Sequence, residues 1–125
     1  MPALSGEDLY LKFNFTRNTD KYKTARLSIQ IDDFEDKTVA WISTWLYKME
    51  DKINVDKPLT FVMKNCLFNS GRFYLSYKLE IDGSVSDMVK NAIKFDVHPH
   101  DYYGTGILVP PNMSSLWMPF EVLKQ

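Results

Sequence analysis

The sequence RFYLSYKLEI, residues Arg72–Ile81, decides the fold class of this protein. Its apolar residues occupy every second position: Phe73, Leu75, Tyr77, Leu79 and Ile81. Successive side chains of a β-strand point to opposite faces of the sheet, so a period of two is typical of a strand with one buried face. The polar residues between them would then face water, as they often do in antiparallel sheets.

Four further stretches repeat this alternation, at 8–15, 26–32, 59–64 and 93–98. Turn-forming residues separate the stretches, at 32–37, 56–58, 69–71 and 82–84, and short strands joined by such turns are typical of a β-sandwich. The sequence therefore predicts an all-β fold, an antiparallel two-sheet sandwich of about seven to nine strands. We expect its core to contain Phe13, Leu27, Ile29, Phe61, Leu75, Leu79, Phe95 and Val97.

Other segments are less regular. Residues Thr38–Tyr47 are apolar or aromatic at both parities, which predicts a strand with both faces occupied. Short helical turns are the interpretation of Lys48–Ile53 and Ser86–Ala92, although neither has a wide apolar stripe. A long loop from His98 to Ser115, rich in proline and glycine, leads to an apolar segment, Leu116–Leu123, which we expect to form a last strand.

Composition limits the function classes. The chain has 125 residues, a size that fits one domain, and its formal net charge of −1 offers no basic surface for nucleic acid. Its single cysteine, Cys66, lies in an apolar setting and is expected to be a buried, inert thiol. We find neither a secretory signal nor an apolar run of membrane-spanning length, which favours the cytoplasm.

The sequence offers little for catalysis or metal binding. It has no phosphate-binding glycine loop, no His-Glu-x-x-His, no Gly-x-Ser-x-Gly and no Cys-x-x-Cys, so we expect neither an enzyme nor a cofactor. His98 and His100 lie two residues apart between Asp96 and Asp101, but Pro99 between them is expected to end the strand and spoil their shared orientation. We predict no metal site.

The aromatic residues point to a carbohydrate. Trp41 and Trp45 share a parity, and flat indole and phenol rings suit the C–H-lined faces of sugars. Nearby polar residues would bind hydroxyl groups. The predicted carbohydrate-binding residues are Trp41, Trp45, Tyr74, Ser28, Gln30, Ser43, Arg72, Ser76 and Lys78. Parity alone leaves an alternative open, in which both tryptophans point into the core and Ala40, Ile42, Thr44 and Leu46 face outward.

The second half of the chain also carries a family pattern. Residues 61–76, FVMKNCLFNSGRFYLS, place an apolar strand, an Asn, a short apolar pair and Gly-Arg-aromatic-Tyr in succession. Residues 87–97, DMVKNAIKFDV, continue with Asp-x-x-x-x-Ala-x-x-Phe-x-Val, and Asp101–Gly106 and Trp117 follow. In this order and spacing, the chain resembles the C-terminal domain of Wzt-type nucleotide-binding subunits of polysaccharide ABC transporters.

The resemblance implies an immunoglobulin-like or jelly-roll sandwich that binds the capped, non-reducing end of a lipid-linked O-antigen glycan before export. It also implies a homodimer with an exchanged C-terminal strand, and partners in the nucleotide-binding and transmembrane subunits of a transporter at the inner membrane. ATPase motifs are absent, so residues 1–125 would be the C-terminal, carbohydrate-binding domain of a longer subunit. The family's sugar contacts vary with the glycan, so no binding residue carries over by motif. The alternative function is a protein-interaction or assembly domain without glycan binding.

Overall fold

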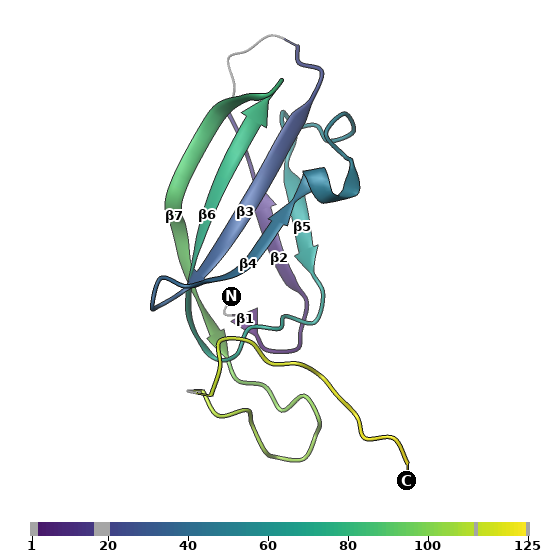
Figure 1. The fold of residues 1–125 in the computed structure, drawn as a ribbon, viewed down its shortest axis with the longest axis vertical. Helices are drawn as coiled ribbons and strands as arrows, with labels where there is room; N and C mark the ends of the chain where they lie inside the picture. Colours follow the sequence, from purple (N-terminus) through teal and green to yellow (C-terminus); the bar gives the residue numbers. More distant parts are fainter. Residues whose placement is uncertain (1–2, 17–20, 112, 125) are drawn as a thin grey trace.

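The computed structural model describes residues 3–16, 21–111 and 113–124, and this part of the chain consists mainly of β-strands (Figure 1). A five-stranded sheet has the order β1-β7-β6-β3-β4, and a two-stranded sheet pairs β2 with β5. The strand bounds are β1 Ala3–Leu4, β2 Leu9–Phe13, β3 Ala25–Asp33, β4 Thr38–Ser43, β5 Leu59–Met63, β6 Gly71–Ile81 and β7 Ser84–His98. One short 3-10 helix, η1 (Thr44–Tyr47), follows β4.

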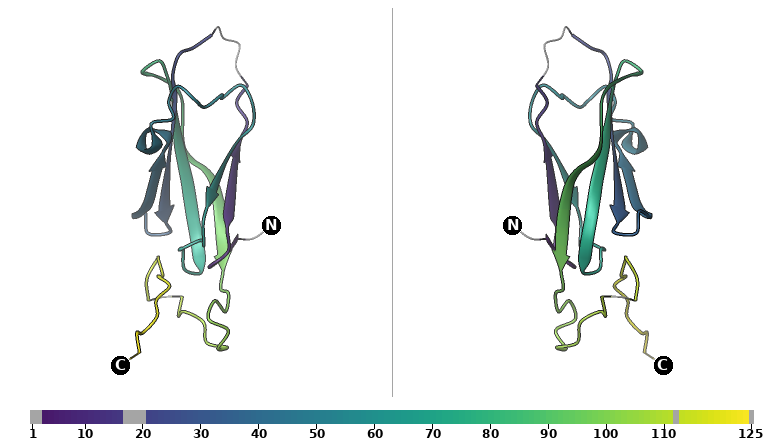
Figure 2. Two further views of the ribbon diagram at one scale, coloured as in Figure 1. Left: turned by 90° about the vertical axis from the view of Figure 1, so that its right-hand side faces the viewer. Right: turned by 90° about the vertical axis from the view of Figure 1, so that its left-hand side faces the viewer.

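The two sheets pack face to face, which confirms the predicted sandwich. Figure 2 shows them edge-on, with β2 on the side opposite β4. Pairing is antiparallel along β3, β4, β6 and β7, while the two-residue strand β1 pairs in parallel with the end of β7. The observed number of strands in the described residues, seven, lies within the predicted range.

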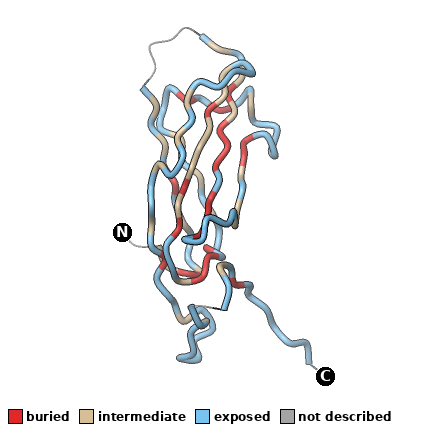
Figure 3. The backbone as a smooth tube through the Cα atoms, turned by 60° about the vertical axis from the view of Figure 1, so that its left-hand side comes forward, coloured by how far each residue is buried: buried red, intermediate tan, exposed pale blue. Residues whose placement is uncertain are grey.

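The hydrophobic core lies between the sheets and follows the predicted alternation (Figure 3). Five of the eight expected core residues are buried: Leu27, Ile29, Leu75, Leu79 and Val97. The other three, Phe13, Phe61 and Phe95, are half-buried and pack against the buried clusters. Cys66 is buried, as predicted, and its burial raises the pKa of the thiol.

Two predicted boundaries along the strands are wrong. Ser86–Ala92 is not helical but forms the first half of β7, paired with β6. The strand predicted over Thr38–Tyr47 ends at Ser43, because the Ser43 hydroxyl accepts a hydrogen bond from the backbone N–H of Trp45 and caps η1. Lys48–Ile53 forms turns after η1.

The predicted last strand is also wrong for the single chain. Within Leu116–Leu123, only Leu116 forms a bridge, to Phe68, and the rest has no regular secondary structure. Residues 118–124, here called the tail, run away from the sheets (Figure 1). The residues just before the tail are anchored, since the side-chain amide of Asn69 donates hydrogen bonds to the carbonyls of Pro110 and Ser114 at 2.9 and 3.0 Å.

Candidate functional site

The strand register places the predicted site on one surface of the five-stranded sheet. Residues that lie opposite one another on neighbouring strands share a face. Gln30 lies opposite Trp41 on β4 and Ser76 on β6, and Ser28 lies opposite Ser43 and Lys78. The face that carries these residues is turned away from β2 and β5, because the alternate residues of β3 and β6 form the core between the sheets. We call it the outer face.

A shallow depression of about 260 Å³ lies in the outer face. Its lining consists of Ser28, Gln30, Trp41, Ser76, Tyr77, Lys78, Met88, Val89 and Lys90. Five of the nine predicted carbohydrate-binding residues are therefore brought together: Trp41, Ser28, Gln30, Ser76 and Lys78. The depression combines one large aromatic ring with hydroxyl, amide and ammonium groups. Its volume suits a small ligand, and it is open to solvent.

Trp41 resolves the question that parity left open. Its side chain is 46% exposed and lines the depression, while its neighbours Ala40 and Ile42 are half-buried and pack against the core. The strand therefore presents Trp41 outward, and the alternative in which Trp41 belongs to the core is wrong. A half-exposed indole on a paired strand offers a rigid ring face at small cost in conformational freedom.

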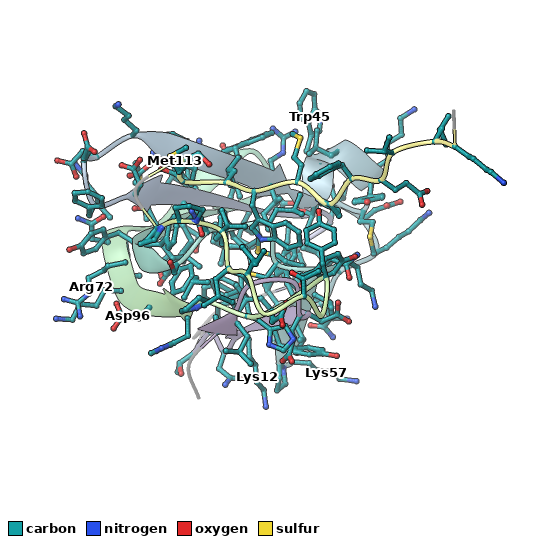
Figure 4. All side chains as sticks on the ribbon, turned by 90° about the horizontal axis from the view of Figure 1, so that it is seen from below. Lys12, Trp45, Lys57, Arg72, Asp96 and Met113 are labelled. Atoms are coloured by element: carbon teal, nitrogen blue, oxygen red, sulfur yellow. The ribbon has the colours of Figure 1, made fainter. Side chains whose placement is uncertain are left out.

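Trp45 lies apart from the depression, because the chain has left the strand at Ser43 and turned into η1. Its ring is 50% exposed and points away from the body, on the side opposite Lys12 and Lys57 (Figure 4). The Arg26 guanidinium lies 5.2 Å from the ring centroid and is itself held by Glu50 at 2.9 Å. Trp45 is thus a second outward aromatic, packed on a charged pair.

The predicted serines have internal partners. The Ser28 hydroxyl donates to the Ser43 hydroxyl at 3.0 Å, and Ser43, which is 4% exposed, also accepts the N–H of Trp45. Ser43 therefore acts as a cap beneath the surface. The Ser76 hydroxyl accepts the backbone N–H of Asn91 at 2.9 Å and remains at the surface of the depression.

Sequence reasoning missed the wall of the depression formed by β7. Leu75 pairs with Ile93 and Tyr77 with Val89, so three residues of β7 lie opposite Ser76 alone. This irregularity is a β-bulge, and Asn91 within it has a φ of 51°. Next to the bulge, Met88 lies opposite Lys78 and Val89 lies opposite Tyr77, so apolar residues stand at both parities and the segment was interpreted as helical.

Tyr77 lines the depression from β6, but its ring points between the sheets, where it packs edge-on against Phe13 and Phe15. Its hydroxyl donates to the Asp87 carboxylate at 2.7 Å. Burial, together with this hydrogen bond and the negative charge of Asp87, raises the pKa of Tyr77 to about 12, so its hydroxyl stays protonated at neutral pH.

Arg72 and Tyr74 lie on the same face but do not line the depression. Arg72 forms a two-bond ion pair with Asp96, at 2.8 and 3.2 Å, at one margin of the sheet (Figure 4). The hydrogen bonds from Arg72 hold the pKa of Asp96 below its ordinary value. Tyr74 is half-buried and lies opposite Asp32 and Lys94, one cross-strand row beyond Gln30 and Ser76.

Two other hollows fit a sugar less well. The one beside His100, Tyr102 and Trp117 has a volume of only about 20 Å³. The hollow under Ile107, Phe120 and Val122 is mainly apolar. Among the described residues, we find no group of three or more His, Cys, Asp or Glu side chains that could hold a metal ion. The described part of the chain also contains no helix with the length and apolar character needed to span a membrane.

Comparisons with known proteins support the fold. No family model matches the sequence, and no curated protein matches it. A structural search finds solved structures that do match, among them the crystal structure of the C-terminal domain of Wzt. The TM-score is 0.68, and the match covers 99% of this chain and 74% of that one, at 12% sequence identity. The chain therefore has the fold of the Wzt C-terminal domain, as the resemblance implied.

Proposed function

We propose that this chain is a non-catalytic glycan-binding domain whose site is the depression on the outer face. The observation that carries the proposal is Trp41, which presents a half-exposed ring beside Gln30, Ser76 and Lys78. The register fixes this arrangement, since Trp41, Gln30 and Ser76 form one cross-strand row. The shared fold with the Wzt C-terminal domain supports the same function.

The physical argument concerns how a sugar is held in water. Water competes for sugar hydroxyl groups, so each new hydrogen bond contributes little net free energy. Burial of the apolar ring faces must supply much of the rest, and a stacked indole does this. An open depression with one such ring would bind weakly, with a dissociation constant in roughly the millimolar-to-micromolar range.

The family resemblance suggests the biological setting. Residues 1–125 would be the C-terminal domain of the nucleotide-binding subunit of a polysaccharide ABC transporter, cytoplasmic and held at the inner membrane by the transporter. There it would bind the capped, non-reducing end of a lipid-linked O-antigen and license its export. ATP hydrolysis would belong to the rest of the subunit, since the sequence of this chain lacks a phosphate-binding loop.

An array of O-antigen oligosaccharides, probed with the purified chain, tests the proposal. Trp41→Ala is expected to abolish binding without loss of the fold, because the ring is half-exposed. Phe34→Ala is the matched control, since Phe34 is a 69% exposed aromatic in the turn between β3 and β4 and does not line the depression. Trp45→Ala tests whether the glycan extends to η1. Equal binding by wild type and Trp41→Ala would exclude the depression as the site.

We also propose that the chain forms a homodimer through exchange of its tail. The tail residues Met118, Phe120, Val122 and Leu123 are 71–82% exposed, which is unfavourable for an isolated chain in water. A groove between β2 and β7, about 290 Å³ in volume, leaves the inward-facing Ile93 49% exposed. An apolar strand from a second copy would cover this groove and pair with the free edge of β2.

Light scattering on the chain and on a variant truncated after Trp117 tests the exchange. The truncation removes the tail but keeps the hydrogen bonds of Trp117 to Cys66 and Leu67. The full chain is expected to be a dimer and the truncated chain a folded monomer. A full chain that is monomeric at all concentrations would contradict the proposal. If the dimer forms but no glycan binds, the assembly-domain alternative gains support.

A further inference from the structure

The charged groups of the depression are of one sign. Two of its lining residues, Lys78 and Lys90, carry ammonium groups, and no lining residue is a carboxylate. The whole chain has a net charge of −1, so this local excess does not reflect a basic protein. A cleft lined by charges of one sign attracts a group of opposite charge.

The two arginines of this face are neutralised, in contrast to the two lysines of the depression. Arg72 is bound by both oxygens of Asp96. Arg26 is bound by Glu50 at 2.9 Å. These arginines have their charges compensated within the fold and need no ligand.

Lys78 and Lys90 lack comparable partners. The Lys78 ammonium lies 3.8 Å from a Glu80 oxygen, a long contact, and Glu80 also lies 3.9 Å from Arg26. Lys90 forms no ion pair with any residue that the structure describes.

The carboxylate nearest to Gln30 is also engaged. Asp32 is buried and accepts hydrogen bonds from the Gln30 amide at 3.1 Å and from the Thr38 hydroxyl at 2.8 Å. It lies in the next cross-strand row, opposite Tyr74, and does not line the depression.

We propose that the sugar unit bound beside Trp41 carries an anionic substituent, a phosphate or a carboxylate, which Lys78 and Lys90 bind. This inference rests on the proposed glycan-binding function and narrows its substrate class. Lysine binds such anions as a compact charge on a flexible stem, without a fixed hydrogen-bond geometry. Ionic hydrogen bonds are stronger than the neutral ones that sugar hydroxyls form, so the anion would add affinity and selectivity to an otherwise weak site.

Matched glycan pairs provide the test. The array carries oligosaccharides that end in glucose or glucuronic acid, and in mannose or mannose 6-phosphate, so each pair differs in one group. The wild-type chain is expected to bind a charged member roughly tenfold more tightly than its neutral counterpart, and to lose this preference as salt is added. The two pairs distinguish a carboxylate from a phosphate.

Lysine variants locate the effect. Lys90→Gln is expected to weaken binding of the charged glycan about three- to tenfold and to leave the neutral one unchanged. Lys78→Gln is expected to weaken binding of the charged glycan by a similar factor, and more than it weakens binding of the neutral one. Lys94→Gln is the matched control, because Lys94 lies on the same face but outside the depression. Chemical shifts of the Ser76 and Asn91 amides would report binding at this place.

The outcomes separate the two proposals. Equal binding of charged and neutral glycans, lost in Trp41→Ala, would overturn the anion proposal and leave the glycan site intact. Equal losses in Lys94→Gln and Lys78→Gln would also overturn it, since the charge effect would then be nonspecific. If no glycan of either kind binds the wild-type chain, the glycan-binding function itself fails, and the anion proposal fails with it.

Discussion

The outer face of the five-stranded sheet and the tail both expose large apolar side chains, yet they do so for different reasons. On the outer face, Trp41 is held on a paired strand between residues whose register is fixed on both sides. In the tail, Phe120 and Val122 are more exposed still, at 71% and 80%, and no strand of the described chain pairs with them. The first arrangement is held by hydrogen-bonded strands on both sides and suits a small ligand, whereas the second lacks strand pairing within the described chain.

The boundary between these two kinds of exposure is Trp117. Its ring is 5% exposed and 4.8 Å from that of Tyr102, and its indole N–H donates to the Cys66 carbonyl at 3.0 Å. Trp117→Ala would remove this anchor and is expected to lower the free energy of unfolding by about 3–5 kcal/mol. Urea unfolding, followed by the remaining tryptophan fluorescence, measures the change.

Phe120→Ala is the control for that variant, measured at a concentration where the chain is monomeric. The ring of Phe120 lies 5.8 Å from that of Tyr103, but Phe120 is 71% exposed, so its loss is expected to change the free energy of unfolding by less than about 0.5 kcal/mol. Similar losses for both variants would show that the tail folds onto its own chain, contrary to the contrast drawn here.

Asp33 joins the two regions, since it ends β3 and also binds the segment before the tail. Its carboxylate accepts hydrogen bonds from the N–H groups of Glu35 and Lys37 and from the Ser115 hydroxyl. Asp33→Ala is expected to cost about 1–3 kcal/mol, since three part-buried hydrogen bonds lose their acceptor. Ser115→Ala, which removes only one of the three bonds, should cost less.

The lowered pKa of the Asp33 carboxylate predicts that the stability of the fold depends on pH. Burial acts to raise the pKa of Asp33, but the hydrogen bonds from Lys37, Ser115 and Glu35 outweigh it and leave the pKa below its ordinary value. A lowered pKa contributes stability above the unfolded value, about 4, and the contribution is lost as pH falls through the folded value. Wild type should therefore lose more stability than Asp33→Ala on acidification, and parallel curves would contradict this.

Substitutions in the bulge of β7 are expected to have a smaller effect on the free energy of unfolding. Asn91 adopts a φ of 51°, a left-handed conformation that asparagine tolerates better than most residues. Asn91→Ala should cost about 1 kcal/mol, and Asn91→Gly should be neutral or slightly stabilising. Thermal unfolding distinguishes the two variants, and an equal cost for both would mean that the Asn side chain, rather than the backbone, holds the bulge.

The strands beside this bulge also show how much of the fold and of the site the sequence predicted. The alternation over Arg72–Ile81 correctly predicted β6, because each residue there has partners on both sides and a fixed face. It failed for Ser86–Ala92, because the polar Asp87 lies opposite the buried Leu79 and the apolar Met88 lies opposite Lys78, which obscures the alternation. The lining residues of the depression on β3, β4 and β6 were therefore mostly among those predicted, while Met88, Val89 and Lys90 on β7 were missed.

The prediction of a last strand over Leu116–Leu123 was wrong for another reason. An apolar segment such as Leu116–Leu123 resembles a strand in sequence, but a strand exists only where another strand offers hydrogen bonds. The described chain supplies one bridge, between Phe68 and Leu116, and beyond it the tail has contacts to Tyr103 but no strand pairing. Sequence pattern thus predicts that a segment is able to form a strand, and cannot predict which chain will pair with it.

The smallest effect is expected at Arg72, whose ion pair with Asp96 lies on the outer face but outside the depression. Both side chains are about half exposed, so water screens their attraction, and Arg72→Gln should leave the unfolding midpoint unchanged within error. The variant should nevertheless raise the pKa of Asp96 toward its ordinary value, which NMR titration of the carboxylate would detect. Glycan binding should be unaffected, because Arg72 is engaged by Asp96. A loss of binding in Arg72→Gln, with the fold intact, would extend the site from the depression to this margin of the sheet.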